Sequence, residues 1–377
     1  MRTNSGGQVR LRAWMVAGVL VAAGFLFARP AAAQVSFSVF GDVDYQATKD
    51  NGYAASNIPA GTTNSFSAPR LELFLTSTQG KLSFLAETMF EVGDANEFGI
   101  DMERIEIGYL FSDKFRLRVG RFHTAIGYYN DAYHHGRYFQ MTVDRPTMVR
   151  FEDEGGLIPA HSVGLHGDGR LPLGGAGNLR YDAEVTNGRG STPGMVTNLD
   201  DPNNGKMYNL RLRFEPTAID GLVIGGSATY DVISASVDGS GEAPFVSIRE
   251  LIFGGHLAYL ENRIHVIGEY LFIQHHNDSA SWTGNTQAGF LELGYDAGII
   301  GPYVRGELAH FPADTKTNDP FFANNALFQS RGSSKSGVVG VKSLLSDYLA
   351  LKLEGEYVHR DDGGTIEIVA AQCAFAF

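Results

Sequence analysis

The chain has 377 residues, with 42 Asp and Glu against 30 Lys and Arg, which gives a formal net charge of −12 at pH 7. This acidic balance disfavours nucleic acid as a partner, because the phosphate backbone is bound by an excess of Lys and Arg. The single cysteine, Cys373, excludes an intramolecular disulfide. We expect it to serve as a small apolar residue rather than a reactive thiol.

The amino-terminal segment has the pattern of a secretory signal peptide. Three arginines among the first twelve residues precede an apolar stretch at 13–27, and Ala31-Ala32-Ala33 offers a small-x-small cleavage site before Gln34. Fifteen apolar residues are too few for a membrane-spanning helix, which needs about 20. We therefore predict a signal peptide at 1–33 and one domain at 34–377. Cleavage would remove four Arg and no acid, so 26 basic residues would face 42 acidic ones and the net charge would be −16.

From residue 35 onward, apolar side chains alternate with polar or small ones in short segments. Ile105, Ile107 and Tyr109, for example, interleave with Glu106 and Gly108. This period of two is typical of strands with one apolar and one polar face. The predicted strands number sixteen and lie at 35–47, 68–77, 81–92, 102–111, 115–121, 161–171, 178–188, 206–216, 221–234, 245–260, 264–275, 286–297, 301–311, 335–345, 348–360 and 365–377.

Connection lengths decide between a soluble sandwich and a membrane barrel, since both have alternating strands. The connections alternate between tight turns, such as 78–80 and 112–114, and long segments, such as 48–67 and 122–161. Short turns on one side and long loops on the other are typical of an outer-membrane barrel. We predict an all-β fold, a transmembrane antiparallel up-and-down β-barrel of about sixteen strands with an inward-folded long loop, located in the cell outer membrane.

The strand predicted at 365–377 alternates to its end, with Val369, Cys373, Phe375 and Phe377 on one face. Because lipid tolerates no unpaired strand edge, this strand has to pair with another to close a barrel. We expect deletion of Phe377 to impair assembly of the barrel more than its function.

The long connection 122–161 is the segment we predict to carry function. It combines five Tyr and Phe between residues 128 and 139 with many charged residues, and aromatic side chains favour burial. Sixteen strands leave a water-filled lumen, so we predict that this connection folds inward and forms a charged constriction with arginines of the preceding strand. The predicted pore-lining residues are Arg116, Arg118, Arg121, Arg137, Asp144, Arg145, Arg150, Glu152, Asp153 and Glu154.

Two local runs resemble a known family. Val119-Gly120-Arg121-Phe122-His123-Thr124-Ala125-Ile126-Gly127-Tyr128 and Phe151-Glu152-Asp153-Glu154-Gly155-Gly156 resemble the strand exit and inward-folding loop of porins related to the phosphate-selective O/P family. The resemblance implies a sixteen-stranded homotrimeric channel of a Gram-negative outer membrane, surrounded by lipid and passing small hydrophilic solutes or ions, with anions such as phosphate among them. The chain differs from that family in one respect. Phosphate selectivity in the family resembles a row of basic residues rich in Lys and Arg, whereas Lys is sparse here.

Three alternatives stay open beside a channel. A barrel plugged by its loops would be a structural protein or receptor. A hydrolase would need His161 and Ser162 to cooperate, although strand neighbours point to opposite faces. A zinc site could involve His134, His135 and His123, but no regular spacing fixes these three on one ion. We therefore expect that the protein is not an enzyme and binds neither a cofactor nor a metal. The histidines of the long connection are expected to form hydrogen bonds instead.

Overall fold

The computed structural model describes residues 34–51, 61–67, 69–92, 98–134, 136–152, 154–191, 193–194, 205–234, 247–277, 282–311, 319–323, 333–361 and 363–377. The predicted signal peptide at 1–33 lies outside the described residues and stays a prediction.

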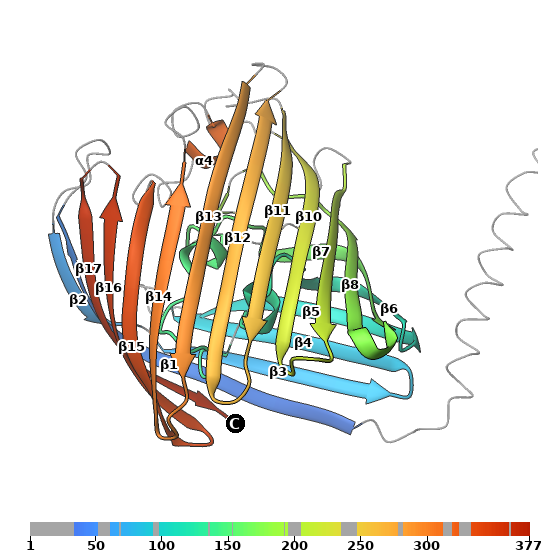
Figure 1. The fold of residues 1–377 in the computed structure, drawn as a ribbon, viewed down its shortest axis with the longest axis horizontal. Helices are drawn as coiled ribbons and strands as arrows, with labels where there is room; N and C mark the ends of the chain where they lie inside the picture. The colour runs from blue at the N-terminus through green and yellow to red at the C-terminus, as the bar shows by residue number, and fades with distance from the viewer. Residues whose placement is uncertain are drawn as a thin grey trace, which may run out of the picture.

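The described residues form antiparallel strands joined into one closed sheet (Figure 1). The helices are short: α2 (Tyr129–Ala132), α4 (Pro320–Ala323) and two single 3-10 turns at Thr147–Val149 and Gly174–Ala176. The strands are β1 (Gln34–Asp50), β2 (Gly61–Phe66), β3 (Arg70–Gln79), β4 (Leu82–Val92), β5 (Phe98–Ser112), β6 (Phe115–His123), β7 (His161–Pro172), β8 (Gly177–Thr186), β9 (Met207–Pro216), β10 (Leu222–Ser234), β11 (Ser247–Tyr259), β12 (Ile264–Asn277), β13 (Trp282–Tyr295), β14 (Ile300–His310), β15 (Ser334–Ser346), β16 (Leu349–Arg360) and β17 (Thr365–Ala376).

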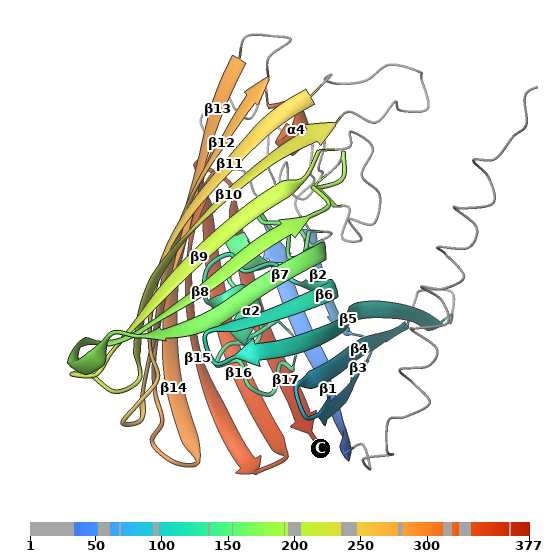
Figure 2. The same ribbon diagram turned by 90° about the vertical axis from the view of Figure 1, so that its right-hand side faces the viewer.

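Sixteen of these strands close a ring, and the ring is sealed between β1 and β17. Phe40 pairs with Ala376 at one end of this seam and Asp50 pairs with Ile366 at the other. The lower part of β1 also pairs with β3, from Gln34 opposite Thr78 to Asp42 opposite Arg70. In Figures 1 and 2, β10 to β13 extend farther from the end with the short turns than β3 to β6 do. The predicted closed barrel is thereby confirmed.

All sixteen predicted strands are present, with ends that differ from the predicted ones by a few residues. The extra strand β2 was not predicted, and it makes the predicted long connection 48–67 wrong in part. Strand β2 continues the line of β3 along the upper part of β1, from Tyr45 opposite Phe66 to Asp50 opposite Gly61. Its side chains are all exposed and do not alternate, so the sequence has no period of two there.

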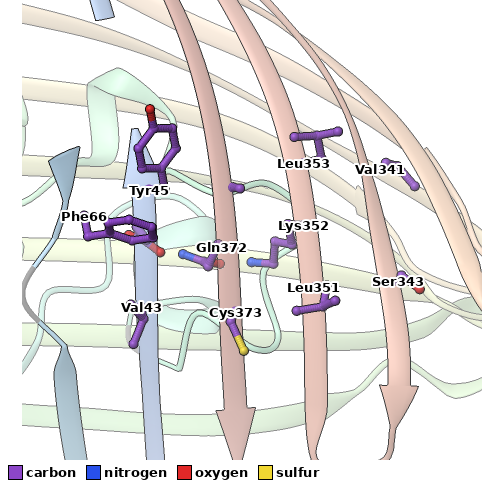
Figure 3. A pocket seen from close by; sticks show the side chains of 12 residues that line it. Val43, Tyr45, Phe66, Val341, Ser343, Leu351, Lys352, Leu353, Gln372 and Cys373 are labelled. Atoms are coloured by element: carbon purple, nitrogen blue, oxygen red, sulfur yellow. The ribbon is translucent and has the colours of Figure 1, made fainter. Parts of the chain in front are cut away.

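The two faces of the wall differ as the alternation predicts. A hollow of about 450 Å³ lies on β1 and β15 to β17 and is lined by apolar outward residues such as Val43, Leu353 and Cys373, whose side chains are drawn in Figure 3. Their neighbours Lys352 and Gln372 are buried on the other face. An apolar outer face and a polar inner face are what lipid on the outside requires. A helix long and apolar enough to cross a bilayer does not occur among the described residues.

The apolar core lies inside the barrel, between the inner wall and the connection from β6 to β7. The inner faces of β10 to β13 contribute buried aliphatic residues that include Ile252, Ile267 and Leu271. The connection packs Ile126, Tyr129, Met148, Val149, Leu157 and Ile158 against this wall. Burial of these side chains stabilises the position of the connection by removing apolar area from water.

Glycine at position 120 allows β6 to leave the wall toward this core. Its φ is +139°, and a Cβ there would lie 2.0 Å from the carbonyl oxygen of Ile105. We predict that Gly120→Ala destabilises the barrel by about 1–3 kcal/mol, as measured by urea unfolding monitored by the electrophoretic mobility of the folded form. Gly255→Ala is the control, since no atom lies within 4 Å of its Cβ position. Equal stability of the two variants would contradict this role of Gly120.

Candidate functional site

The connection between β6 and β7, which we name the inner loop (residues 124–160), folds into the lumen as predicted. Its helix α2 lies inside the ring in both ribbon views (Figures 1 and 2). Thr124, Ile126, Tyr129 and Ile158 are each at most 1% exposed. A loop buried in this way needs partners for its backbone polar groups.

Glutamates of the inner wall provide the partners for backbone N–H groups of the inner loop. Each of these carboxylates is nearly fully buried and comes from a different strand. Two amides at the start of α2 donate to the same carboxylate, where the positive end of the helix also favours an anion. The bonds run from Ala125 to Glu184 (3.0 Å), from Tyr128 and Tyr129 to Glu269 (2.9 and 2.5 Å), from Gly136 to Glu72 (2.7 Å), from Val143 to Glu354 (2.9 Å) and from Thr147 to Glu307 (2.7 Å).

Cationic side chains of the wall donate hydrogen bonds to carbonyl groups of the inner loop. Lys342 donates to the carbonyl of Tyr138 at 2.5 Å, and Lys352 donates to those of Arg137 and Thr142 at 2.6 and 2.8 Å. Arg211 and Arg305 act in the same way on Gly127 and Asp144, each at 2.9 Å. Together with the glutamates, these bonds attach the inner loop to the wall from β3 to β16.

Arg145 holds the inner loop together from within. Its guanidinium donates to the carbonyls of Val149, Tyr133 and His134 and to the side chain of Asn130, at 2.6–3.1 Å. It also lies over the Phe151 ring, 4.6 Å from the centroid. Burial lowers the pKa of Arg145 to about 10, so the guanidinium stays charged at neutral pH. At 2% exposure, this predicted pore residue lies inside the loop.

Arg116 and Arg118 lie on the inner wall with different exposure. The Arg116 side chain is 39% exposed and the Arg118 side chain is 15% exposed. Both contact Asp168 of β7 at 3.1 Å, and Arg118 also contacts Glu106 of β5 at 3.2 Å. The third predicted arginine, Arg121, is buried and donates from Nε to the Glu103 carbonyl at 2.9 Å.

A second group of predicted residues meets the wall at β1 and β3. Arg137 is 3.0 Å from Asp44 and 3.4 Å from Asp144, and Arg150 is 3.7 Å from Asp144. Glu154, 40% exposed, faces Arg70 at 4.0 Å. Burial by itself would raise the pKa of Asp144, but Arg150 and Arg137 outweigh it and lower that pKa to about 2. Asp144 therefore stays ionised at neutral pH.

The remaining two predicted residues are Glu152 and Asp153. Glu152 is 1% exposed and accepts the backbone amide of Ala160 at 2.7 Å. Asp153 lies outside the described residues. The structure thus separates the nine described residues into two partly exposed groups, Arg116 with Arg118 and Asp144 with Arg150 and Glu154, and four buried residues, Arg121, Arg137, Arg145 and Glu152. The pore-lining role of all ten stays a prediction.

Several charged residues next to Arg116 and Arg118 were not predicted as site residues. Arg213 and Arg180 on the inner wall are 20% and 44% exposed and contact Asp182 and Glu215. Asp131 of α2 faces them from the inner loop, 2.8 Å from Arg211 and 3.9 Å from Arg213. The wall residues share the inward parity of their strands, so the sequence contained a signal for them. No sequence signal marked Asp131, because its position depends on the fold of the inner loop.

Ser162 and His161, the residues considered for a hydrolase, each contact other groups. The Ser162 hydroxyl lies 2.7 Å from the Thr124 hydroxyl, both buried. His161 Nε2 lies 2.7 Å from a carboxylate oxygen of Glu103 and 2.7 Å from His134 Nε2. The imidazole is thus directed to a histidine and a glutamate.

Comparison with solved structures places the fold among outer-membrane barrels. An anion-selective porin from Comamonas acidovorans is 13% identical, with a TM-score of 0.60, and the match covers 91% of this chain and all of that one. The outer membrane channel DcaP of Acinetobacter baumannii is 9% identical, with a TM-score of 0.56 over 93% and 99% of the two chains. OmpT, an outer membrane protein of Vibrio cholerae, is 12% identical, with a TM-score of 0.57 over 93% and 99%.

Neither a protein-family description nor a curated protein sequence matches the chain. The structural likeness shows a porin-like sixteen-strand barrel of the outer-membrane type, which agrees with its apolar outer face. The narrower resemblance to the phosphate-selective O/P family is not confirmed.

Removal of one wall carboxylate tests how the inner loop is held. We predict that Glu269→Ala accelerates hydrogen exchange at the Tyr128 and Tyr129 amides about tenfold or more. The variant leaves two buried N–H donors without their acceptor, and an unsatisfied buried donor costs about 1–3 kcal/mol. Hydrogen exchange followed by mass spectrometry would measure this. Glu367→Ala, which removes an exposed carboxylate on the outer face, is the matched control. Unchanged exchange in Glu269→Ala would show that other contacts hold the loop.

Proposed function

We propose that this protein is an outer-membrane channel for the passive diffusion of small hydrophilic solutes or ions. The observation that carries the proposal is the partly exposed charged group on β6 to β9, opposite Asp131 of the inner loop. Buried charges only attach the loop, whereas these exposed ones are accessible to water. A solute passing between wall and loop would therefore move through a transverse electric field.

Weak selectivity by charge follows from the pairing of these residues. Arg116, Arg118, Arg180 and Arg213 form a basic row, which supports a preference for anions. Each of them has a carboxylate within 3.2 Å, however, so most of the positive potential is neutralised locally. We propose a channel that discriminates by size and dipole, with a slight preference for anions and without a dedicated phosphate site.

We further propose that the channel is a homotrimer. OmpT of Vibrio cholerae, a structural neighbour, is described in a trimer form. The hollow on the outer face of β1 and β15 to β17 (Figure 3) offers an apolar surface that a second copy would cover.

A non-conducting barrel is the second candidate, and one observation favours it. The inner loop is bonded to β3, β8, β12, β14 and β16, so it reaches the wall on nearly every side. In that case the protein would serve as a structural barrel or a receptor.

Single-channel recording in a planar lipid bilayer separates the two candidates. We expect ohmic conductance that closes in three equal steps, one for each pore of a trimer. A silent bilayer after verified insertion would refute the channel and favour the plugged barrel. A single step would refute the trimer alone.

The charged group on the wall can be tested by reversal potential under a salt gradient. We predict that the double variant Arg116→Gln and Arg118→Gln shifts permeability toward cations, because Asp168 and Glu106 lose their counter-charges. The shift should be larger at about 0.1 M salt than at about 1 M, since the screening length falls from roughly 10 Å to roughly 3 Å. Arg121 is left unchanged because it is buried and donates a hydrogen bond to the Glu103 carbonyl.

Lys49→Gln is the control for the double variant. It removes a positive charge from an exposed pair with Glu367, so we expect the reversal potential of wild type. An unchanged potential in the double variant at low salt would show that permeating ions do not pass this part of the wall.

A further inference from the structure

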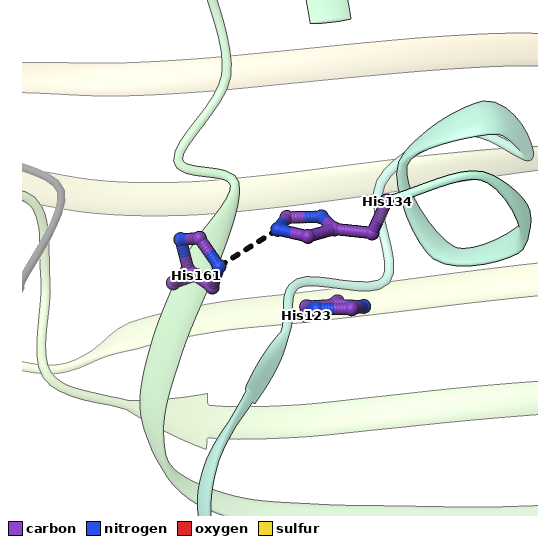
Figure 4. Close-up of side chains that lie close together, drawn as sticks. All are labelled: His123, His134 and His161. Atoms are coloured by element: carbon purple, nitrogen blue, oxygen red, sulfur yellow. Dashed lines mark hydrogen bonds between the residues drawn. The ribbon is translucent and has the colours of Figure 1, made fainter. Parts of the chain in front are cut away.

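Three histidines from separate parts of the chain meet beside the inner loop. His123 ends β6, His161 begins β7 and His134 follows α2 (Figure 4). One nitrogen of each imidazole lies within 4.8 Å of the other two. Each residue is at most 5% exposed. The sequence analysis considered His123 and His134 only together with His135 and expected no metal there. The structure instead groups His123 and His134 with His161, and His135 lies outside the described residues.

Neighbouring groups orient the cluster. His134 Nδ1 lies 3.1 Å from the backbone oxygen of Asn130, which can only accept, so this nitrogen carries the proton. Nε2 of His134 is therefore the nitrogen with a lone pair, and it points to His161 Nε2 at 2.7 Å (Figure 4). Asn130 is itself fixed by bonds to the carbonyls of Thr124 and Ala160. Partners that fix the tautomer and the ring in this way are typical of metal-binding histidines.

One carboxylate completes the donor set. Glu103 Oε2 lies 2.7 Å from His161 Nε2, whereas Glu87 Oε2, at 3.6 Å from His123 Nε2, is already paired with Arg104. Both glutamates are buried, at 5% and 0% exposure. Three imidazoles and a carboxylate suit zinc and neighbouring transition metals, whereas calcium and magnesium prefer oxygen donors alone.

An ion has a route to the cluster. A cavity of about 270 Å³ between the inner wall and the inner loop is lined by His123 and His134 together with Asp131, Phe40 and Arg104. Asp131, which lines this cavity, is itself 41% exposed to water. The buried imidazoles are therefore reachable from the lumen.

We propose that His123, His134 and His161 form a binding site for a transition-metal ion, with Zn²⁺ as its best occupant. Nitrogens that bind one Zn²⁺ at about 2.0–2.1 Å lie roughly 3.4 Å apart in a tetrahedron. The 2.7 Å pair would open by about 0.7 Å and the widest pair would close by at most about 1.4 Å. The rings of His123 and His134 are stacked, with centroids 3.4 Å apart and planes at 17°, so the His123 ring has to turn before its in-plane lone pair faces the same ion as that of His134. The bound ion would cross-link the inner loop to β6 and β7.

This proposal does not depend on conductance, because a barrel with or without an open lumen contains the same three residues. Its direct readout is binding. Since the ion replaces protons on imidazole nitrogens, affinity should fall as the pH is lowered.

Equilibrium dialysis of the folded, detergent-solubilised protein against ZnSO₄, with metal measured by mass spectrometry, tests the site. We expect one Zn²⁺ per chain, and an affinity at least about 100-fold lower for His134→Gln and for His161→Gln, since even indirect partners of a metal contribute 10- to 100-fold. Glu103→Gln should weaken binding about tenfold. With Co²⁺, the wild type should show the visible absorption of a tetrahedral site.

His256→Gln is the matched control, because His256 is also a buried histidine of the inner wall, outside this cluster. Its Zn²⁺ affinity should equal that of wild type. Folding of each variant is verified by its heat-modifiable electrophoretic mobility. Loss of binding only in the cluster variants supports the site. Absence of stoichiometric binding to wild type, or equal binding to the folded cluster variants, would overturn it.

Discussion

The structure depends on the need to satisfy the backbone of a loop that lies inside a barrel. Each buried N–H or C=O group without a partner costs free energy comparable to a lost hydrogen bond. Here the partners are charged side chains of the wall, with glutamates such as Glu269 and Glu354 accepting amides and Lys352 and Arg305 donating to carbonyls. These bonds hold the inner loop in its position against the wall, and this position defines what remains of the lumen.

This arrangement also accounts for the acidic composition of the chain. Several of the carboxylates that make the net charge −12 are buried and bound to backbone amides or to arginines. They contribute little to the potential that a passing solute would meet. Between the wall and the inner loop, partly exposed charges include Arg116, Arg180, Arg213 and Asp131 in one group and Asp144 and Glu154 in another, so the local field there differs from the field that composition alone suggests.

The ends of the inner loop connect the two proposals. Gly120, with its positive φ, allows β6 to leave the wall, and the residues that follow it bring His123 against His134, with ring centroids 3.4 Å apart. The same loop closure places Asp131 of α2 against Arg211. The histidine cluster and the charged group on the wall are thus positioned by one segment, and a change in the anchoring of this segment would alter both.

The sequence by itself determined the barrel, the strand positions and the inward parity of residues such as Arg118 and Glu269, because a period of two is a local property of each strand. It also indicated that the segment after Phe122 turns inward, from its aromatic and charged content. Only the tertiary structure decided that Arg145 is enclosed by carbonyls of its own loop, that Arg121 is buried and that His161 joins His123 and His134. These positions result from contacts between residues far apart in the chain, and no local pattern encodes them. The same reason applies to β2, which is held by pairing with β1 rather than by an alternation of its own.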